Sequence, residues 1–108
     1  MTKVLWFSRH IMSKEQAEAL MIRLGNTEIT QLSKSIQSAQ DIAQEIGAHD
    51  IIAVVAPPQL LAGILKIAGD KPVITAKMER TVLPDGSVEM KFVKWERVLR
   101  IDIVKEDF

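Results

Sequence analysis

Short strand-like runs alternate along the chain with longer segments in which apolar residues recur every three or four positions. The runs lie at residues 4–7, 28–32 and 51–56, and a segment of helical period follows each one. The run at 51–56 is apolar without alternation, which is typical of a central strand covered on both faces, whereas 28–32 is more polar and fits an edge strand. Since successive strand–helix units are joined by right-handed crossovers, the pattern predicts a parallel sheet.

Each of the three predicted helices has recognisable start and stop signals. The first begins at Ser13, whose spacing to Gln16 is that of a capping box, and ends at Gly25. The second covers residues 35–47 and the third covers residues 58–69. Positions expected to face the core are Ala17, Leu20, Met21 and Leu24 in the first helix and Ile36, Ala39, Ile42, Ala43 and Ile46 in the second.

The C-terminal third of the chain changes to the period of two that marks strands with one wet face. A fourth strand is expected at 73–76 and a turn at 83–87, where Pro, Asp and Gly supply the backbone conformations of a tight turn. Alternation at 88–92 and again at 99–103 predicts an antiparallel hairpin. The expected fold is α/β: one domain over residues 1–108, a Rossmann-like three-layer sandwich whose central, mostly parallel sheet carries a C-terminal antiparallel β-hairpin extension.

Composition excludes several classes of protein and of site. The 108 residues contain no cysteine, so disulfide frameworks, thiolate zinc sites and cysteine nucleophiles are ruled out. The longest apolar run, residues 51–58, is far shorter than the roughly 20 residues of a membrane-spanning helix, and the first residues lack the pattern of a secretion signal. Fourteen basic residues balance fourteen acidic ones, which argues against long nucleic acid or an anionic membrane as partner. We therefore expect a soluble cytoplasmic protein.

Ligands of open parallel sheets bind outside the carboxyl ends of the strands, and this rule nominates four short segments. They are residues 8–10, 31–35, 57–59 and 76–80. The first of them, Ser8-Arg9-His10, places a hydroxyl, a guanidinium and an imidazole just before a capped helix, which suits a phosphate group. The chain has neither the Gly-rich dinucleotide signature nor a Walker-type phosphate loop, so those two modes of phosphate binding are unsupported.

Structural interpretations of the same residues are also available. Arg9 and His10 fit an ordinary solvated loop, and Ser33 or Ser35 fits a helix cap, although Lys34 beside them could contact phosphate. For an arbitrary α/β domain these interpretations are the commoner ones, because short motifs often match by chance. The residues alone therefore indicate the strand ends as candidate binding segments, but they do not show which ligand these segments bind.

The basic and aromatic residues late in the chain are open to two interpretations. Lys77 and Arg80 either gather at the carboxyl edge of the sheet or charge a solvated edge strand. Trp95 fits a packing anchor better than a base-stacking platform. His49 precedes a predicted strand and His10 follows one, so the two imidazoles are expected at opposite ends of the sheet. No metal site is therefore expected.

Two segments of the chain resemble the ends of small standalone CRISPR-associated proteins. In that family a first strand ends in Phe-Ser-His and is followed by Thr-x-Glu-Gln; residues 6–16 here resemble this, with Arg9 inserted before His10 and with Ser13 at the place of the threonine. Residues 72–88, with a Leu-Pro-Asp-Gly-Ser turn, and the aromatic and basic residues at 92–97 are similar to the C-terminal portion of the family. The family is similar to the Rossmann-like CARF sensor domains of type III CRISPR systems. Some members are ring nucleases, which bind and linearise cyclic oligoadenylate second messengers.

The resemblance implies a metal-independent, cofactor-free ring nuclease that cleaves a cyclic oligoadenylate, cyclic tetra-adenylate above all, and so switches off type III CRISPR signalling. In this class a ribose 2′-hydroxyl attacks the adjacent phosphorus and leaves a 2′,3′-cyclic phosphate. A ring with internal two-fold symmetry suits two protomers related by a two-fold axis, so we expect a homodimer. The expected catalytic residues are His10, Lys77 and Arg80, with His10 acting on the leaving 5′-oxygen or the 2′-hydroxyl, and the expected ligand-binding residues are Ser8, Arg9, Lys34 and Gln59.

This assignment requires the segments after the first and fourth strands to lie side by side and to form one cationic seat for phosphate. Two other functions remain open on the sequence alone. One is a module that senses or sequesters a cyclic nucleotide without cutting it. The other is a small structural or oligomerisation protein whose late hairpin, with Phe92 and Trp95, pairs with another chain.

Overall fold

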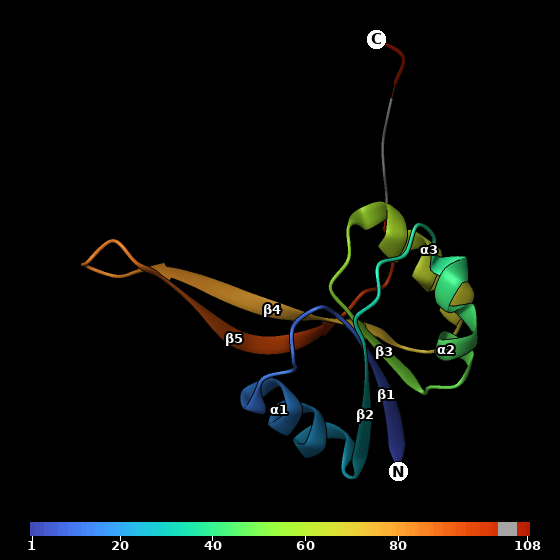
Figure 1. Cartoon of the computed structure of the whole chain (residues 1–108), viewed down its shortest axis with the longest axis horizontal. Coiled ribbons are helices and arrows are strands. Elements are labelled where there is room, and N and C mark those ends of the chain that lie inside the picture. The colour runs from blue at the N-terminus through green and yellow to red at the C-terminus, as the bar shows by residue number, and fades with distance from the viewer. Residues whose placement is uncertain (102–105) are drawn as a thin grey trace.

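One mixed sheet forms the centre of the computed structural model, which describes residues 1–101 and 106–108 (Figure 1). Its strands are β1 (Thr2–Phe7), β2 (Thr27–Leu32), β3 (Ile51–Val54), β4 (Val73–Val82) and β5 (Val88–Arg97). They lie in the order β2-β1-β3-β4-β5; β2, β1, β3 and β4 are parallel and β5 is antiparallel to β4. The predicted fold class, a mostly parallel sheet with a C-terminal antiparallel hairpin, is confirmed.

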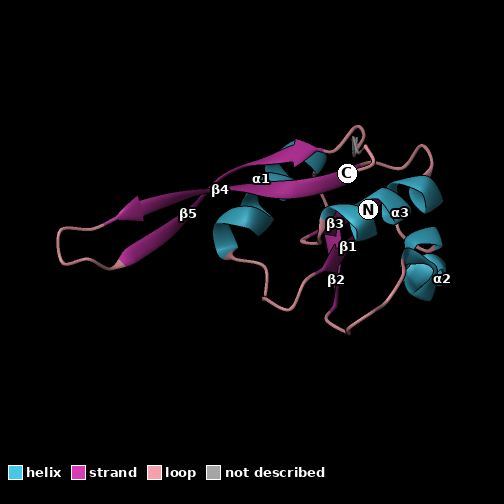
Figure 2. Cartoon of the chain, turned by 90° about the horizontal axis from the view of Figure 1, so that it is seen from above, coloured by secondary structure: helices cyan, strands magenta, loops and turns pink. Residues whose placement is uncertain are grey.

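Helices cover both faces of the sheet and complete three layers, as Figure 2 shows from above. They are α1 (Lys14–Leu24), the 3-10 helix η1 (Ala39–Ile42), α2 (Ala43–Gly47) and α3 (Pro58–Ala68). The alternation of side chains along β1 produces two cores. Val4 and Trp6 pack with Leu20 on the side of α1, whereas Leu5 and Phe7 pack on the side of η1, α2 and α3.

The first helix begins where the sequence predicts, with the capping box formed. The Ser13 hydroxyl accepts a hydrogen bond from the Gln16 N–H at 3.2 Å, and the Gln16 side-chain oxygen accepts one from the Ser13 N–H at 2.9 Å. The predicted buried stripe is wrong at Met21, which is 54% exposed, while Gln16 and Leu20 are buried. The reason is the hairpin: the Trp95 indole N–H donates to the Gln16 carbonyl at 3.0 Å, so this side of α1 faces inward.

The second predicted helix, residues 35–47, is wrong in its first part. Residues 33–38 are not helical, and the helical structure consists of η1 and α2 only. The Asp41 carboxylate accepts hydrogen bonds from the N–H groups of Gln37 at 3.1 Å and Ser38 at 3.2 Å. Because these bonds hold the chain in a turn at Ser38, the helix starts after that residue and not at a serine further upstream.

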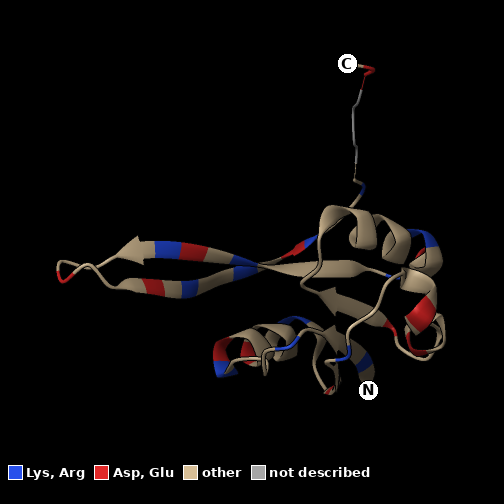
Figure 3. Cartoon of the chain, turned by 45° about the horizontal axis from the view of Figure 1, so that its top comes forward, with Lys and Arg blue, Asp and Glu red and all other residues tan. Residues whose placement is uncertain are grey.

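The fourth strand extends further than the sequence predicts. A strand of residues 73–76 is expected, but β4 continues to Val82, because β5 pairs with it along its whole length. The register shifts between Lys77 and Met78, where the pairing has a bulge. Beyond this point the two strands leave the body of the molecule as a long arm, along which acidic and basic residues alternate with others (Figure 3). We call residues 77–94 the hairpin arm.

The hairpin arm ends in the turn that the sequence predicts at 83–87. The Leu83 N–H donates to the Ser87 carbonyl at 2.8 Å, and Gly86 takes a positive φ of 86°. The strand predicted at 99–103 is wrong where it is described, because β5 ends at Arg97 and residues 98–101 are not in a strand. The remainder of that predicted strand lies outside the described residues.

Candidate functional site

A cavity of about 350 Å³ opens at the carboxyl ends of β1, β2 and β3. β1 lies between β2 and β3. The chain therefore passes from β1 to β2 on one side of β1 and later returns to form β3 on the other side of β1. In open α/β sheets ligands bind at this point, where the strand order reverses. We call it the strand-end cavity, and its lining residues are Phe7, Ser8, Arg9, His10, Ser33, Lys34, Ser35, Ile36, Val55, Pro57 and Leu60.

The loop after β1 is held by a set of hydrogen bonds to its backbone. The buried Ser8 hydroxyl accepts from the His10 N–H at 3.1 Å, which closes a tight turn. The His10 carbonyl accepts from the Trp6 indole at 2.7 Å and from the Gln31 side chain at 3.1 Å, and Gln31 also donates to the Ser8 carbonyl at 3.2 Å. The backbone of this loop is therefore fixed, while the side chains of Arg9 and His10 stay exposed at the cavity.

Arg9 spans the mouth of the strand-end cavity from the β1 loop to the β2 loop. One of its terminal guanidinium nitrogens donates a short hydrogen bond to the hydroxyl of Ser35. The sequence interpretation of Ser35 as a helix cap is wrong, because the helical structure begins only at Ala39, and the Ser35 hydroxyl contacts Arg9 instead. The remaining guanidinium donors of Arg9 have no hydrogen-bond or ion-pair partner among the described residues, so they are available to an anion.

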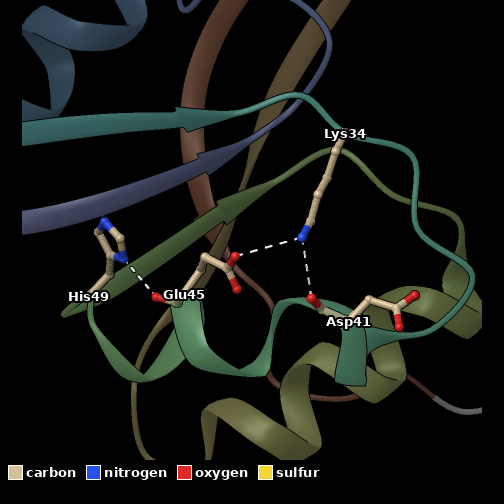
Figure 4. A network of polar contacts seen from close by, with 4 residues as sticks. All are labelled: Lys34, Asp41, Glu45 and His49. Carbon is tan, nitrogen blue, oxygen red and sulfur yellow. Dashed lines mark hydrogen bonds and ion pairs between the residues drawn. The ribbon is translucent and has the colours of Figure 1, made fainter.

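Lys34 is tethered to the helical layer, as Figure 4 shows. Its ammonium group lies 3.7 Å from a Glu45 carboxylate oxygen and donates to the Asp41 carbonyl at 3.4 Å. The Lys34 and Glu45 side chains are 47% and 35% exposed, so the ion pair is screened by water and is weak. His49 contacts the Glu45 carbonyl at 2.6 Å, before β3, at the opposite end of the sheet from His10. Its predicted structural role is consistent with this contact.

The polar part of the lining consists of cations and hydroxyls. Arg9, Lys34 and the titratable His10 lie with three serines, and none of the lining residues is acidic. The apolar part, which sequence reasoning missed, comes from Phe7, Ile36, Val55 and Leu60. A pocket with this lining is complementary to a small anion that also carries an apolar or aromatic surface.

Three of the predicted site residues do not line the strand-end cavity. Gln59 is exposed in the first turn of α3, and Lys77 and Arg80 lie on the hairpin arm. β3 separates β1 from β4, and β4 does not end near the cavity but continues into the arm. Being an odd number of positions apart in a strand, Lys77 and Arg80 also point to opposite faces. The expected seat shared by the segments after the first and fourth strands is therefore not formed within one chain.

Within residues 1–101 and 106–108 there is no group of three or more His, Asp or Glu side chains that could hold a metal ion. No helix in the described part of the chain is long and apolar enough to span a bilayer. Comparison with known protein families, with curated proteins and with solved structures finds no match to this chain.

Proposed function

We propose that the chain binds a cyclic oligoadenylate, cyclic tetra-adenylate above all, at the strand-end cavity and cleaves it without a metal ion. The observation that carries the proposal is the lining of this cavity: Arg9, His10 and Lys34 with three hydroxyls and no acid, at the reversal point of an α/β sheet. A phosphodiester supplies an anion for Arg9 and a second, competing partner for Lys34, which is paired with Glu45. Adenine supplies a flat surface for the apolar wall.

The size of the cavity supports a ligand shared between two chains. A volume of about 350 Å³ is at the small end of the range of roughly 300–1,000 Å³ for ligand pockets. It suits one nucleotide unit better than a whole ring. Two copies related by a two-fold axis present the cavity twice to a ring that itself has two-fold symmetry. A homodimer is therefore part of the proposal.

His10 is the catalytic residue in the proposed reaction. The ribose 2′-oxygen attacks the adjacent phosphorus, the bond from phosphorus to the 5′-oxygen breaks, and the products are a 2′,3′-cyclic phosphate and a 5′-hydroxyl. The 2′-hydroxyl proton passes to water, the His10 imidazolium donates a proton to the leaving 5′-oxygen, and solvent reprotonates His10. The fixed backbone of the β1 loop supports this role, because it limits the positions that the imidazole can take.

Arg9 and Lys34 bind the phosphate and stabilise the charge that develops on it in the transition state. Lys34 gives up its ion pair with Glu45 in this step, which costs about 1 kcal/mol or less for an exposed pair. Lys77, Arg80 and Gln59 receive no role, because they do not line the cavity.

The test is incubation of the purified protein with cyclic tetra-adenylate in EDTA, with mass-spectrometric detection of linear products. We expect 2′,3′-cyclic phosphate ends, and a loss of rate of about a hundredfold or more for His10→Ala, since general acids contribute at least that much. Lys34→Ala should bind the ring about tenfold more weakly, whereas Lys66→Ala, which removes an exposed cation of α3 outside the cavity, should bind it normally. Absence of binding by the wild-type protein refutes the proposal.

Binding without products in the same experiment identifies the non-catalytic alternative, a module that senses or sequesters the cyclic nucleotide. The same residues hold the ligand in both cases. A ligand present at a hundred times its Kd stabilises the folded protein by about 2.7 kcal/mol, so thermal unfolding measures binding independently of cleavage.

A second candidate function, oligomerisation through the hairpin arm, is favoured by one observation. Paired residues of antiparallel strands share a face, so Met78, Val82, Val88 and Met90 lie together on the face of the arm that continues from Trp95, with Arg80 as the partner of Met90. These four side chains are 39%, 65%, 46% and 56% exposed, in the order given. An isolated two-stranded ribbon is only marginally stable in water, so a second copy that covers this face stabilises the arm. Sedimentation velocity over a range of concentrations tests it.

A further inference from the structure

A second cavity, of about 580 Å³, lies on the side of the sheet covered by α1. Its floor is formed by Ile51 of β3, Ile74 of β4 and Trp95 of β5, and its wall by Leu20 and Leu24 of α1. We call it the helix-side cavity. It shares no lining residue with the strand-end cavity.

The connection of the strands explains why this cavity is open. η1, α2 and α3 together cover one face of the sheet, whereas α1 is the only described helix on the other face. After β4 the chain turns directly into β5 and makes no helical crossover. The part of this face between α1 and β5 is therefore left without a covering helix, and its floor is apolar.

Three cationic residues line the helix-side cavity, and two of them lie on its side of the sheet. Arg23 lies in the last turn of α1, and Arg97 lies in β5 two positions from Trp95 and on the same face, whereas Lys94, one position from Trp95, faces the other side. The ion pairs of the described residues are formed by other lysines, and no hydrogen bond of the two arginine side chains occurs in that part of the chain. None of the lining residues is acidic. The cavity is thus complementary to a negative charge.

The remaining lining residues indicate what kind of ligand carries the negative charge. Apart from the three cations and the indole, every lining side chain is aliphatic or proline, and none has a neutral amide or hydroxyl. A base or a sugar buried here would leave hydrogen-bonding groups without partners, which costs about 1–3 kcal/mol for each group. An aliphatic or aromatic hydrocarbon body has no such cost and gains from burial.

We propose that the helix-side cavity binds a small molecule with a hydrocarbon body and a single anionic head, a carboxylate or a phosphate. The body lies on the apolar floor beside Trp95, and the head lies between the cations of α1 and β5. This site is independent of the strand-end cavity and of the function proposed there.

The test is calorimetric titration of the full chain with four ligands that share one decyl chain: decanoate, decyl phosphate, decanol and decylammonium. We expect at least one of the two anions to bind, with decanol about tenfold or more weaker and decylammonium weaker still, because charge-assisted hydrogen bonds to arginine are lost. The stronger of the two anions identifies the head group. Equal binding of decanol and the anions overturns the proposal, as does the absence of anion binding.

Variants locate the binding at this cavity. Arg23→Gln and Arg97→Gln should each weaken anion binding by about tenfold, because each removes one charged donor while both positions are exposed and tolerate the change. Lys66→Gln is the matched control, since it removes an exposed cation from the opposite side of the sheet and should change nothing. Circular dichroism verifies that all three variants are folded. An affinity that is the same in all three variants and in the wild-type protein overturns the assignment.

Discussion

At the scale of single residues, the β1 loop shows how side chains outside a cavity determine its shape. Gln31, at the end of β2, donates to the carbonyls of both Ser8 and His10. A neighbouring strand thus sets the conformation of the loop that carries the proposed catalytic imidazole. The sequence places Gln31 at a strand end, but nothing in its spacing indicates which carbonyls it reaches.

Replacement of Gln31 by alanine should loosen this loop. Gln31→Ala removes two hydrogen bonds, so we expect a loss of unfolding free energy of about 1 kcal/mol and faster amide exchange at residues 8–10. Chemical denaturation and hydrogen exchange measure the two effects. Gln59→Ala is the control, because Gln59 is exposed and its side chain makes no hydrogen bond among the described residues. Equal behaviour of the two variants contradicts the role given to Gln31.

The turn of the hairpin arm contains a carboxylate with a shifted titration. The Ser87 hydroxyl and the Ser87 N–H donate to the Asp85 carboxylate, at 2.6 Å and 2.9 Å, and these bonds lower the pKa of Asp85 from its ordinary value of 3.8. Because the folded-state pKa is the lower one, the stabilisation of the turn is present above the unfolded-state pKa and is lost as the pH falls through the folded-state pKa.

Substitution of the hydroxyl partner should raise this pKa. Ser87→Ala removes the hydroxyl bond, which lowers the pKa of Asp85 more than the N–H bond does. The pKa of Asp85 should therefore move back towards 3.8. An NMR titration of the Asp85 side-chain carbon below neutral pH measures the shift. A midpoint identical to that of the wild-type protein is the result that contradicts this cause.

At the scale of elements, the packing of α3 against η1 depends on one glycine. A Cβ atom placed on Gly63 would lie 3.0 Å from the Cβ of Ala39, which is closer than side chains normally approach. Since the Ala39 Cβ moves only with its backbone, η1 would have to shift away from α3. The absence of a side chain at Gly63 therefore allows the two helices to approach closely.

Gly63→Ala should lower the unfolding free energy by about 1 kcal/mol, although alanine favours helix by about that amount over glycine, because overpacking costs about 1–3 kcal/mol. Thermal and chemical unfolding measure the change. Gly47→Ala, where an added Cβ meets nothing within 4 Å, serves as the control and should be neutral or stabilising. The double variant Gly63→Ala/Ala39→Gly should lose less stability than the two single variants together, and a purely additive loss would mean that the close contact is not the cause.

Two elements that depend on local pattern were predictable from the sequence, whereas competing local hydrogen bonds and distant strand partners were not. The capping box at Ser13 and the turn at 83–87 are formed by near neighbours, and both occur as predicted. The helix predicted at 35–47 is shortened by bonds to Asp41, which compete locally with helix formation. The extension of β4 to Val82 requires β5 as a partner, and apolar spacing alone does not reveal that pairing.

The residues of the candidate site were likewise predictable only in part. Ser8, Arg9, His10 and Lys34 were predictable because they follow strands whose order places their ends together. Lys77 was assigned to a loop at a strand end, and that assignment is wrong because the strand does not end there.

At the scale of the whole molecule, the hairpin arm is the feature that a second copy of the chain would cover. Val82 and Thr81 are adjacent in β4 and point to opposite faces of the arm. The same substitution at the two positions therefore gives a test variant and its matched control. The face that carries Val82 is the more apolar one, although Arg80 also lies on it, and the face that carries Thr81 pairs it with Glu89.

If the apolar face is a dimer contact, Val82→Lys should weaken self-association by about a hundredfold or more, because it places like charges against each other at the interface. Thr81→Lys, on the other face, should leave association unchanged. Sedimentation velocity of both variants beside the wild-type protein measures the effect. A monomeric wild-type protein at all concentrations contradicts the proposed homodimer.

The edge-to-face pair of Trp6 and Trp95 has a practical consequence. Their ring centroids are 5.7 Å apart at 89°, and they are the two tryptophans of the chain. One lies in the first strand and the other in the last, so nearly the entire polypeptide must be in place before the indoles meet. Intrinsic fluorescence therefore reports the completion of folding and not the formation of an early local nucleus.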